Sequence, residues 1–423
     1  MLLEFKVKNF RSIKDWQSFS MLAENKVKEH DDVVTEKTGF NFLASSIVYG
    51  RNASGKSNLL KALNAFDLLV TNSASFKEGQ EIKFYDPFKL SAKANDEPVE
   101  FYIDFLAENE IRYIYSVGYG KSAIEYEKLV FYPKSKPATL YSRIKNQKIS
   151  YGEYLTGRKK EIEDFLYPNQ LFLSKVGTEK NEQLKIPHNF FAEKLVTVSA
   201  HDTELDKRIT RIIMNVDNPV AKVNINKLMK VADTGIERIY VRQQDFDDSS
   251  LPDNMPLEER EYLSDKYKYQ IKTVRNTFDN NEESGEIEFS LEDESTGTKK
   301  LLIVGGIAML SMIVGAVLII DELDKSLHPK LTRALIKLFH SKKTNPNNAQ
   351  LIFATHDVSL LDPDLFRRDQ VWFAEKEQEG DSHYYALSDI PGVRANTPYE
   401  KWYMSGRFGA TPSINEYELD FEF

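Results

Sequence analysis

The sequence predicts an α/β fold in which a mixed and parallel sheet is flanked by helices, with an antiparallel β layer and a helical insertion. The first observation is an apolar strand pattern, SSIVYG, followed by a glycine-rich turn and helical spacing of apolar residues. The second is another apolar strand pattern, AVLII, which ends in acidic residues. The third is a set of strand-like runs separated by turn residues, such as VEFYIDFLA and RYIYSVGYG, which indicates the antiparallel layer.

The 423 residues suit two domains or one domain with a large insertion. We expect a first lobe over 1–150, a helical insertion over 151–263, a second lobe over 264–395 and a tail over 396–423. Within the insertion the runs EYLTGRKKEIEDFLY and DKRITRIIMNVDN have helical character, and no sustained heptad pattern predicts a long coiled-coil arm. After it, YKYQIKTVRNTF and GEIEFSLEDES resume strand patterns, and DQVWFAEKEQ and SHYYALSDI are expected to be edge strands.

Composition excludes several classes of protein. The chain has no cysteine, which excludes disulfides and thiolate metal sites. Its net charge of −9 argues against a protein that coats nucleic acid without specificity, although binding of DNA stays possible. The basic run Tyr132–Lys148 is expected to be a solvated hairpin rather than a phosphate track. The first residues alternate apolar and charged side chains, which predicts a half-buried strand and not a signal peptide, so we expect a cytoplasmic protein.

The run GRNASGKS matches the phosphate-binding pattern G-x-x-x-x-G-K-[ST] at every fixed position. A strand pattern precedes it and a helical pattern follows it, as this loop requires. Backbone N–H groups of such a loop surround phosphates at a helix N-terminus, with the lysine on the β and γ phosphates and the serine on Mg²⁺. The expected nucleotide contacts are Gly50, Asn52, Ala53, Ser54, Gly55, Lys56, Ser57 and Asn58.

The uncharged run from Leu301 to Ile320 allows two interpretations. Twenty apolar residues are about the length of a membrane-spanning helix. However, glycines and a serine interrupt the run, and it ends in AVLIIDELD. A buried strand that delivers Asp321 and Glu322 at its carboxyl end fits this ending better, with a buried helix before it. Asp321 would then bind the Mg²⁺ shell and Glu322 would act as general base on water. With the run buried in the core, no membrane contact is expected.

Two further segments extend this site. LIFATH is an apolar strand that ends at His356, so three strands end in Gly50, in Asp321 and in His356. Ligands of open α/β sheets bind at the carboxyl ends of strands, and we therefore expect these groups to converge. The segment STGTK places Ser295 and Gly297 at a helix start, where a hydroxyl and a backbone N–H can meet a phosphate; Ser295 alone would be only an N-cap.

The order NFRS, GxxxxGKS, STG, LIIDELD, SLHP and ATH resembles the ABC-type ATPase heads of the SMC and RecF-like group. This resemblance implies an ATPase that uses ATP and Mg²⁺ and forms a homo-oligomer by ATP-dependent dimerisation of two heads. It also implies that Ser295 and Gly297 act across the dimer, that Asp324 lies at the head–head interface, and that His356 senses the γ-phosphate. Arg11 of NFRS would reach toward phosphate. The signature ESTGTK departs from LSGGQ, and no glutamine for the Mg²⁺ contact of this group can be placed.

The runs DELDKSLHP, DQVWFAEK and GRFGATPSI resemble prokaryotic defence ATPases of the RloA and abortive-infection (AbiLi) type, relatives of the ATPase subunit of PARIS anti-phage systems. That resemblance implies a sensor or regulator subunit that acts with a separate effector protein, such as a Toprim-like nuclease. The alternatives are a RecF-like DNA-repair or DNA-tethering ATPase, which ATP-dependent and salt-sensitive duplex binding would favour, and a transporter ATPase subunit.

Overall fold

The structure is a computed structural model that describes residues 1–177, 181–198, 219–246, 251–252, 255, 260, 263–264 and 268–412. It divides into two compact units. Unit 1 comprises Met1–Thr197, Gly315–Leu323 and Ile336–Phe423, and unit 2 comprises Val198–Val314 and Asp324–Leu335. These units do not coincide with the domain bounds expected from the sequence, because residues 151–197 belong to unit 1.

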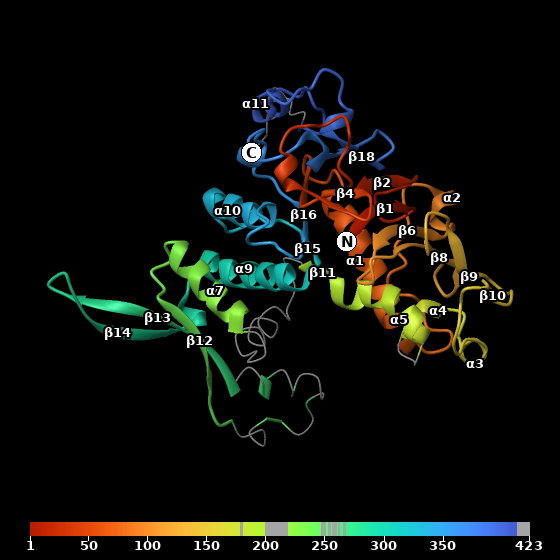
Figure 1. Ribbon diagram of the computed structural model, residues 1–423, viewed down its shortest axis with the longest axis horizontal. Coiled ribbons are helices and arrows are strands. Elements are labelled where there is room, and N and C mark those ends of the chain that lie inside the picture. Colours follow the sequence, from red (N-terminus) through yellow and green to blue (C-terminus); the bar gives the residue numbers. More distant parts are fainter. Residues whose placement is uncertain are drawn as a thin grey trace, which may run out of the picture. The chain divides into compact units, whose positions relative to one another are not determined.

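A six-stranded sheet forms the centre of unit 1 (Figure 1). Its order is β11-β15-β16-β5-β17-β18, and its four middle strands are parallel while β18 runs antiparallel to β17. The strands are β5 (Ser45–Tyr49), β11 (Leu195–Val198), β15 (Val317–Ile320), β16 (Gln350–Ala354), β17 (Val371–Lys376) and β18 (Ser382–Ala386). The prediction that DQVWFAEKEQ is an edge strand is wrong, because β17 pairs with both β5 and β18. Only the second predicted edge strand, β18, lies at an edge.

A seven-stranded antiparallel sheet forms a second layer of unit 1, as the strand-like runs predicted. Its order is β10-β9-β8-β7-β6-β1-β2, and β1 carries its side chains alternately buried and half-buried. The strands are β1 (Leu2–Lys8), β2 (Gln17–Ser20), β6 (Val99–Leu106), β7 (Arg112–Tyr119), β8 (Ile124–Phe131), β9 (Ala138–Ile144) and β10 (Ser150–Tyr151). The basic run Tyr132–Lys148 folds into β9 and its flanking turns, where Arg143 donates to the carbonyl of Gln170 and Lys145 pairs with Glu125.

Helix α1 (Lys56–Asn72) contacts both sheets of unit 1. Most of its apolar residues recur at helical spacing and are buried, and Phe66 lies 5.0 Å from the ring of Phe101 and 5.6 Å from that of Tyr115 on the antiparallel sheet. The two sheets are also joined directly by Gln350 at the start of β16, whose amide bonds the backbone of Leu2 and Leu43. The loop before α1 is therefore held by a rigid core.

The stretch 151–263 is not wholly helical, and this corrects the prediction. Its described residues form α3 (Lys160–Glu163), α4 (Phe172–Gly177), α5 (Glu182–Asn189), α7 (Pro219–Val231) and a π-helical turn at Phe190–Lys194, but also β11 and β12 (Arg238–Gln243). The run 153–167 is helical only at α3, and the predicted helix at 206–218 lies outside the described residues. Buried Glu127 of β8 explains why α4 belongs to unit 1: its carboxylate accepts from the Phe172 and Leu173 N–H groups and from the hydroxyls of Tyr115 and Tyr141.

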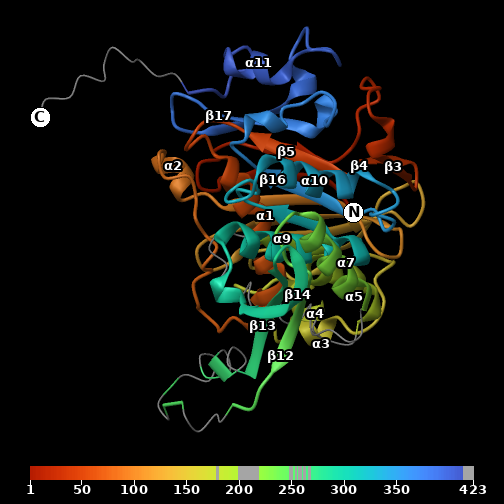
Figure 2. The ribbon, with the colours of Figure 1, turned by 90° about the vertical axis from the view of Figure 1, so that its left-hand side faces the viewer.

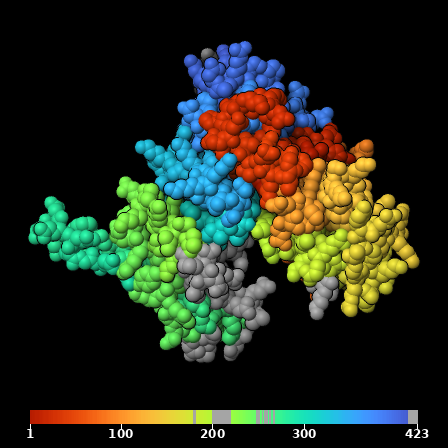
Figure 3. All heavy atoms as spheres, in the orientation of Figure 1, coloured from red at the N-terminus to blue at the C-terminus, as the bar shows by residue number. Residues whose placement is uncertain are grey.

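Unit 2 contains a three-stranded sheet, β12-β13-β14, with β13 (Tyr269–Asp279) and β14 (Glu282–Ser290) forming a long hairpin. Figures 1 and 3 show the hairpin extending beyond α7 as a narrow projection, and nearly all of β14 is exposed. Helix α9 (Thr296–Val314) packs against α7, so closely that a side chain at Gly305 would meet Leu228. By length and composition α9 could cross a membrane, but 56% of its most apolar window is buried, as in a core helix.

Besides short 3-10 helices, the described chain contains three further α-helices and one further hairpin. They are α2 (Ala92–Asn95), α10 (Pro329–His340), α11 (Tyr399–Met404) and the hairpin of β3 (Val34–Lys37) with β4 (Phe40–Leu43). Helix α10 connects β15 to β16, as predicted. Helix α11 lies beside β17 and β18 in both views (Figures 1 and 2), with the ring of Tyr403 5.6 Å from Phe373 and 5.8 Å from Tyr49.

Candidate nucleotide site

The loop after β5 has the backbone conformation that a phosphate-binding loop needs. Gly50 and Gly55 both have positive φ, at 153° and 110°. A side chain at Gly50 would lie 2.4 Å from the carbonyl oxygen of Ala374, and one at Gly55 would lie 2.2 Å from Ser382 Oγ. Only glycine fits at either position, since both the conformation and the space exclude a Cβ. The two fixed glycines of the sequence pattern are thus explained by the packing of β17 and β18 against the loop.

Lys56 lies at the first position of α1 and is almost fully buried, with 6% of its surface exposed. Its ammonium donates to the carbonyl oxygens of Gly50, at 2.6 Å, and Arg51, at 3.1 Å. The first turn of α1 carries no acidic side chain, so the partial positive charge of the helix N-terminus is not neutralised there. The ammonium and the helix N-terminus together favour an anion at this loop.

Ser57 and Asp321 are brought together as the sequence predicts. The Ser57 hydroxyl donates to Asp321 Oδ1 across 3.0 Å, and both residues are half-buried. A hydroxyl and a carboxylate are hard oxygen ligands, which Mg²⁺ prefers, and it commonly takes one or two protein ligands plus phosphate and water oxygens. In the part of the chain that the structure describes, no cluster of three or more acidic or histidine side chains could hold a metal alone. The hydroxyl and the carboxylate therefore fit a Mg²⁺ that is also bound by nucleotide phosphate.

The strand register places the other predicted groups at the same edge of the sheet. Ile320 of β15 is opposite Phe353 of β16, and Ala354 is opposite Val48 of β5. Because these strands are parallel, the segments that begin at Gly50, at Asp321 and after Ala354 all leave the same edge. His356, two residues beyond β16, is exposed there.

Glu322 has a backbone conformation that is costly for a residue with a side chain. Its φ is 55°, in the left-handed region, which costs about 1 kcal/mol for a non-glycine residue. The next residue, Leu323, donates its N–H to the carbonyl of Ala354, which fixes the turn beside β16. Backbone strain of this kind is concentrated at functional sites. The half-buried Glu322 follows directly after Asp321, which is the position where the sequence predicts a general base.

For four of the predicted nucleotide contacts, the structure shows only bonds within the protein or an exposed position. Arg11 is paired with Asp86 at 3.3 Å, with its side chain 38% exposed, so its contact with phosphate stays a prediction. Asn52 and Ala53 are exposed at the tip of the loop, and Ala53 has a φ of 61°. Asn58 donates to the hydroxyl of Ser12, which is the residue after Arg11.

Three residues at the loop were not found from the sequence. Ser12, Ser382 and Tyr384 contact the backbone or side chains of residues 54–58. They are distant from the loop in sequence, and Ser382 and Tyr384 belong to no motif, so only the fold brings them there. Their single signal was that Ser12 lies in the NFRS run, which the sequence linked to phosphate through Arg11 instead.

Unit 2 holds the remaining predicted residues. Ser295 is the N-cap of α9, since its Oγ accepts from the N–H of Thr298 at 3.1 Å. A side chain at Gly297 would lie 2.9 Å from the carbonyl oxygen of Ser326, which explains the glycine. Asp324 Oδ1 is buried and has no hydrogen-bond partner among the described residues. The capping bond shows the structural role of Ser295, while its role across a dimer stays a prediction.

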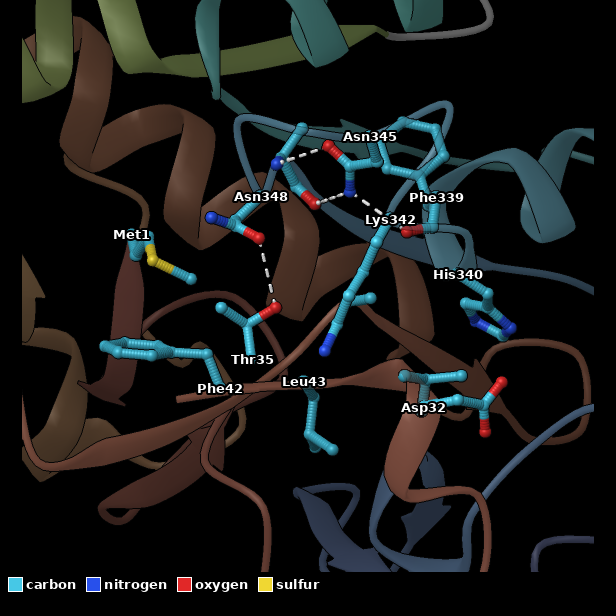
Figure 4. Close-up of a pocket in the computed structure, with 13 residues that line it drawn as sticks. Met1, Asp32, Thr35, Phe42, Leu43, Phe339, His340, Lys342, Asn345 and Asn348 are labelled. Atoms are coloured by element: carbon cyan, nitrogen blue, oxygen red, sulfur yellow. Dashed lines mark hydrogen bonds between the residues drawn. The ribbon is translucent and has the colours of Figure 1, made fainter. Parts of the chain in front are cut away.

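The cavity in Figure 4 is a different site from the loop. It is lined by Leu43 and Ala44 before β5 and by Asn345, Asn348 and Ala349 before β16. It therefore lies at the amino ends of the parallel strands, whereas the phosphate-binding loop lies at their carboxyl ends. Asn345 and the pair of Thr35 with Asn348 fill it with internal hydrogen bonds, which indicates a structural role.

A parallel sheet with a phosphate-binding loop, an acidic pair and a histidine at one edge defines a P-loop nucleotide-binding domain. The chain belongs to the family described as "AAA domain, putative AbiEii toxin, Type IV TA system", whose model matches residues 45–182 and 195–362. The match includes the loop, both acidic residues and His356. None of the curated proteins matches the chain.

Solved structures that resemble the chain include an Smc head domain and RecF. One is the Smc head domain with an extended coiled coil from Pyrococcus furiosus, bound to the C-terminal domain of ScpA, at 12% identity and a TM-score of 0.41, covering 91% of this chain and 96% of that one. The recombination mediator protein RecF in two nucleotide-containing structures, RecF-ATPrS and RecF-ATP, shows 15% and 14% identity, each with a TM-score of 0.36. Each covers 91% of this chain, and 98% and 97% of the RecF chains are covered.

Proposed function

We propose that this chain binds ATP with Mg²⁺ and hydrolyses it to ADP and phosphate. The observation that carries the proposal is the 3.0 Å hydrogen bond between Ser57 and Asp321, which joins the phosphate-binding loop to the acidic strand end. In the proposed complex, the loop N–H groups and Lys56 hold the phosphates, and Ser57 and Asp321 hold the cation. Bound Mg²⁺ would offset the negative charge on the β and γ phosphates.

Glu322 is the proposed general base. Its carboxylate takes a proton from the attacking water as the water oxygen bonds to the γ-phosphorus, and the bond from that phosphorus to the β–γ bridging oxygen breaks. ADP leaves with the electrons of that bond, and the proton is then released to solvent. His356, at the end of the neighbouring strand, would contact the γ-phosphate and so distinguish ATP from ADP.

Hydrolysis in this class serves as a switch, and we propose that two chains form the switch together. Ser295 and Gly297 of one head would contact the γ-phosphate held by the other, with Asp324 at the interface. This step rests on the resemblance to ABC-type heads. The N-terminal position of Ser295 on α9 supports it, because helix N-termini favour phosphate.

The biological role that we propose is a sensor or regulator of a prokaryotic anti-phage system that acts through a separate effector. Two observations support it. The family description names a toxin of a type IV toxin–antitoxin system. The described residues also contain no cluster of acidic side chains that could serve as a nuclease metal site, so a Toprim-like nuclease activity would belong to a partner.

The alternative is a RecF-like DNA-repair or DNA-tethering ATPase. The two roles differ in what ATP controls. Duplex binding that requires ATP and weakens steeply with salt would favour the DNA role, whereas ATP-dependent association with an effector protein, without duplex binding, would favour the defence role. The net charge of −9 supports the defence role over the DNA role.

The experiment for the switch is the solution mass of Glu322→Gln, measured by light scattering with and without Mg-ATP. Without the base, bound ATP persists, so the mass should double only with ATP. The double variant Lys56→Ala, Glu322→Gln is the matched control and should stay at the lower mass. An unchanged mass for Glu322→Gln with bound ATP would contradict dimerisation of the heads by ATP alone.

A further inference from the structure

The edge strand β18 contacts the phosphate-binding loop with two consecutive side chains of one face. Ser382 and Tyr384 are both buried on the same face of β18, because residues two apart in a strand share a face. Ser382 Oγ lies 2.7 Å from the carbonyl oxygen of Ser54, and the Tyr384 hydroxyl lies 2.7 Å from that of Gly55. Two neighbouring carbonyls of the loop are thus bound by two neighbouring side chains of the strand.

These bonds help to fix where the loop N–H groups point, and on the Gly55 carbonyl the Tyr384 hydroxyl adds to the N–H of Asn58, which donates there across 2.8 Å. In a planar trans peptide the C=O and N–H bonds are antiparallel. A donor that holds the Ser54 carbonyl therefore aims the N–H of Gly55 in the opposite direction, and a donor on the Gly55 carbonyl does the same for the N–H of Lys56. Loop N–H groups of this kind are the ones that surround phosphates.

A chain of hydroxyls fixes the orientation of Ser382. Its Oγ lies 2.7 Å from Ser12 Oγ, and Asn58 Nδ2 donates to Ser12 Oγ across 2.7 Å. Because a carbonyl only accepts, the Ser382 proton goes to Ser54 and the Ser12 proton goes to Ser382. The N–H of Ser382 also donates to the carbonyl of Ser12, which ties the strand to the NFRS segment.

We propose that Ser382 and Tyr384 are positioning residues for nucleotide phosphate, acting through the backbone of Ser54 and Gly55. The inference rests on the proposed ATP site and adds the residues that orient it. Neither side chain touches the phosphates in this account, so both act on binding rather than on the chemical step. The N–H groups they aim hold phosphate equally in the ground and transition states. Their loss should therefore raise KM and leave kcat nearly unchanged.

The test is steady-state ATP hydrolysis and melting temperature for Ser382→Ala and Tyr384→Phe. Each variant leaves a loop carbonyl with one donor fewer, and we expect KM for Mg-ATP to rise about tenfold with kcat within about twofold. Ser388→Ala is the matched control, since Ser388 donates to Glu24 near the end of the same strand and away from the loop. It should keep the wild-type KM.

The possible failures give different results. An unchanged KM in both variants would overturn the positioning role. A lower apparent kcat with unchanged KM and a lower melting temperature would show that the residues only support folding, and would overturn it as well. If Ser382→Ala does not fold, Tyr384→Phe decides alone. Failure of the proposed function looks different: the wild-type protein would then show no ATP hydrolysis, or Lys56→Ala would hydrolyse ATP as well as the wild type.

Discussion

The hydroxyl of Ser57 donates to the carboxylate of Asp321 across 3.0 Å, although 264 positions separate the two residues in the chain. Ser57 lies in the first turn of α1 and Asp321 follows β15, and the parallel sheet brings them to one edge. Their distance is short enough for both oxygens to bind one cation. This pair therefore links the anion-binding loop to the residues proposed for hydrolysis, and the first prediction concerns it directly.

Replacing Asp321 by asparagine should weaken binding of Mg-ATP by about tenfold while changing binding of ATP in EDTA much less. The reason is that a neutral amide oxygen is a poorer Mg²⁺ ligand than a carboxylate, whereas Lys56 and the loop are untouched. Titration calorimetry with and without Mg²⁺ measures both affinities. Asp364→Asn, at an exposed position, is the control. An equal loss in both conditions would mean that Asp321 only supports the loop.

Replacing Gly55 by alanine should abolish nucleotide binding. The added Cβ would lie 2.2 Å from Ser382 Oγ, and the φ of 110° is itself unfavourable for alanine. Gly79→Ala is a sharp control, because Gly79 has a φ of 73° but open space around its Cα. That variant should lose about 1 kcal/mol of stability and keep the wild-type affinity for ATP. Equal affinities in the two variants would contradict the close packing of β18 on the loop.

Unfolding free energy should fall as the pH is lowered because of His340. Burial lowers the pKa of this histidine to about 4, and its Nε2 lies 2.7 Å from Ser45 Oγ. A histidine with a lowered folded-state pKa binds a proton more readily when unfolded. Its contribution is thus complete above the unfolded pKa of 6.5 and is lost as pH falls toward 4.

The expected loss from this group between pH 7.5 and pH 5 is about 2 kcal/mol. Urea unfolding at both pH values measures it. His340→Asn should show a smaller difference between the two pH values than the wild type, whatever its absolute stability. The same difference in both proteins would mean that other groups, such as buried His188, whose pKa burial also lowers, account for the acid sensitivity.

Gln350→Ala should destabilise unit 1 by about 3 kcal/mol. The buried amide accepts from the N–H of Leu2 at 2.7 Å and donates to the carbonyl of Leu2 at 3.1 Å, so it joins the two sheets. Its removal leaves buried backbone groups without partners and opens a cavity. Urea unfolding followed by tryptophan fluorescence reports the loss, with exposed Gln147→Ala as control. A loss below about 1 kcal/mol would show that the sheets hold together without this link.

The sequence was most informative where a motif and its flanking pattern are local. An apolar run that ends in a motif predicts each of β5 with its loop, β15 and β16. Because the strands are parallel, Gly50, Asp321 and His356 must then lie at the same edge of the sheet. The structure confirms this part of the fold. A helix that is apolar on all sides has the same composition in a protein core and in a bilayer, so composition alone does not separate the two interpretations of the run Leu301–Ile320. The burial of α9 agrees with the core interpretation.

Non-local pairing was not predictable in the same way. The local pattern of β17 predicts an edge strand, because nothing local shows that β5, more than 300 positions earlier, pairs with it. The local pattern of 151–263 predicts helices, because β12 is short and its register comes from β13. Ser382 and Tyr384 carry no motif, and only the packing of β18 on the loop reveals them. The roles of Ser295 and Arg11 toward phosphate, and of Asp324 at a head–head interface, stay predictions.

The most direct measurement of the central claim is titration calorimetry of Mg-ATP into the wild-type protein and into Lys56→Ala. The ammonium of Lys56 lies inside the loop, at hydrogen-bond distance from the carbonyls of Gly50 and Arg51. We predict one ATP bound per chain in the wild type and an affinity at least about 30-fold weaker in the variant. Equal affinities in the two proteins would contradict the assignment of this loop as the nucleotide site.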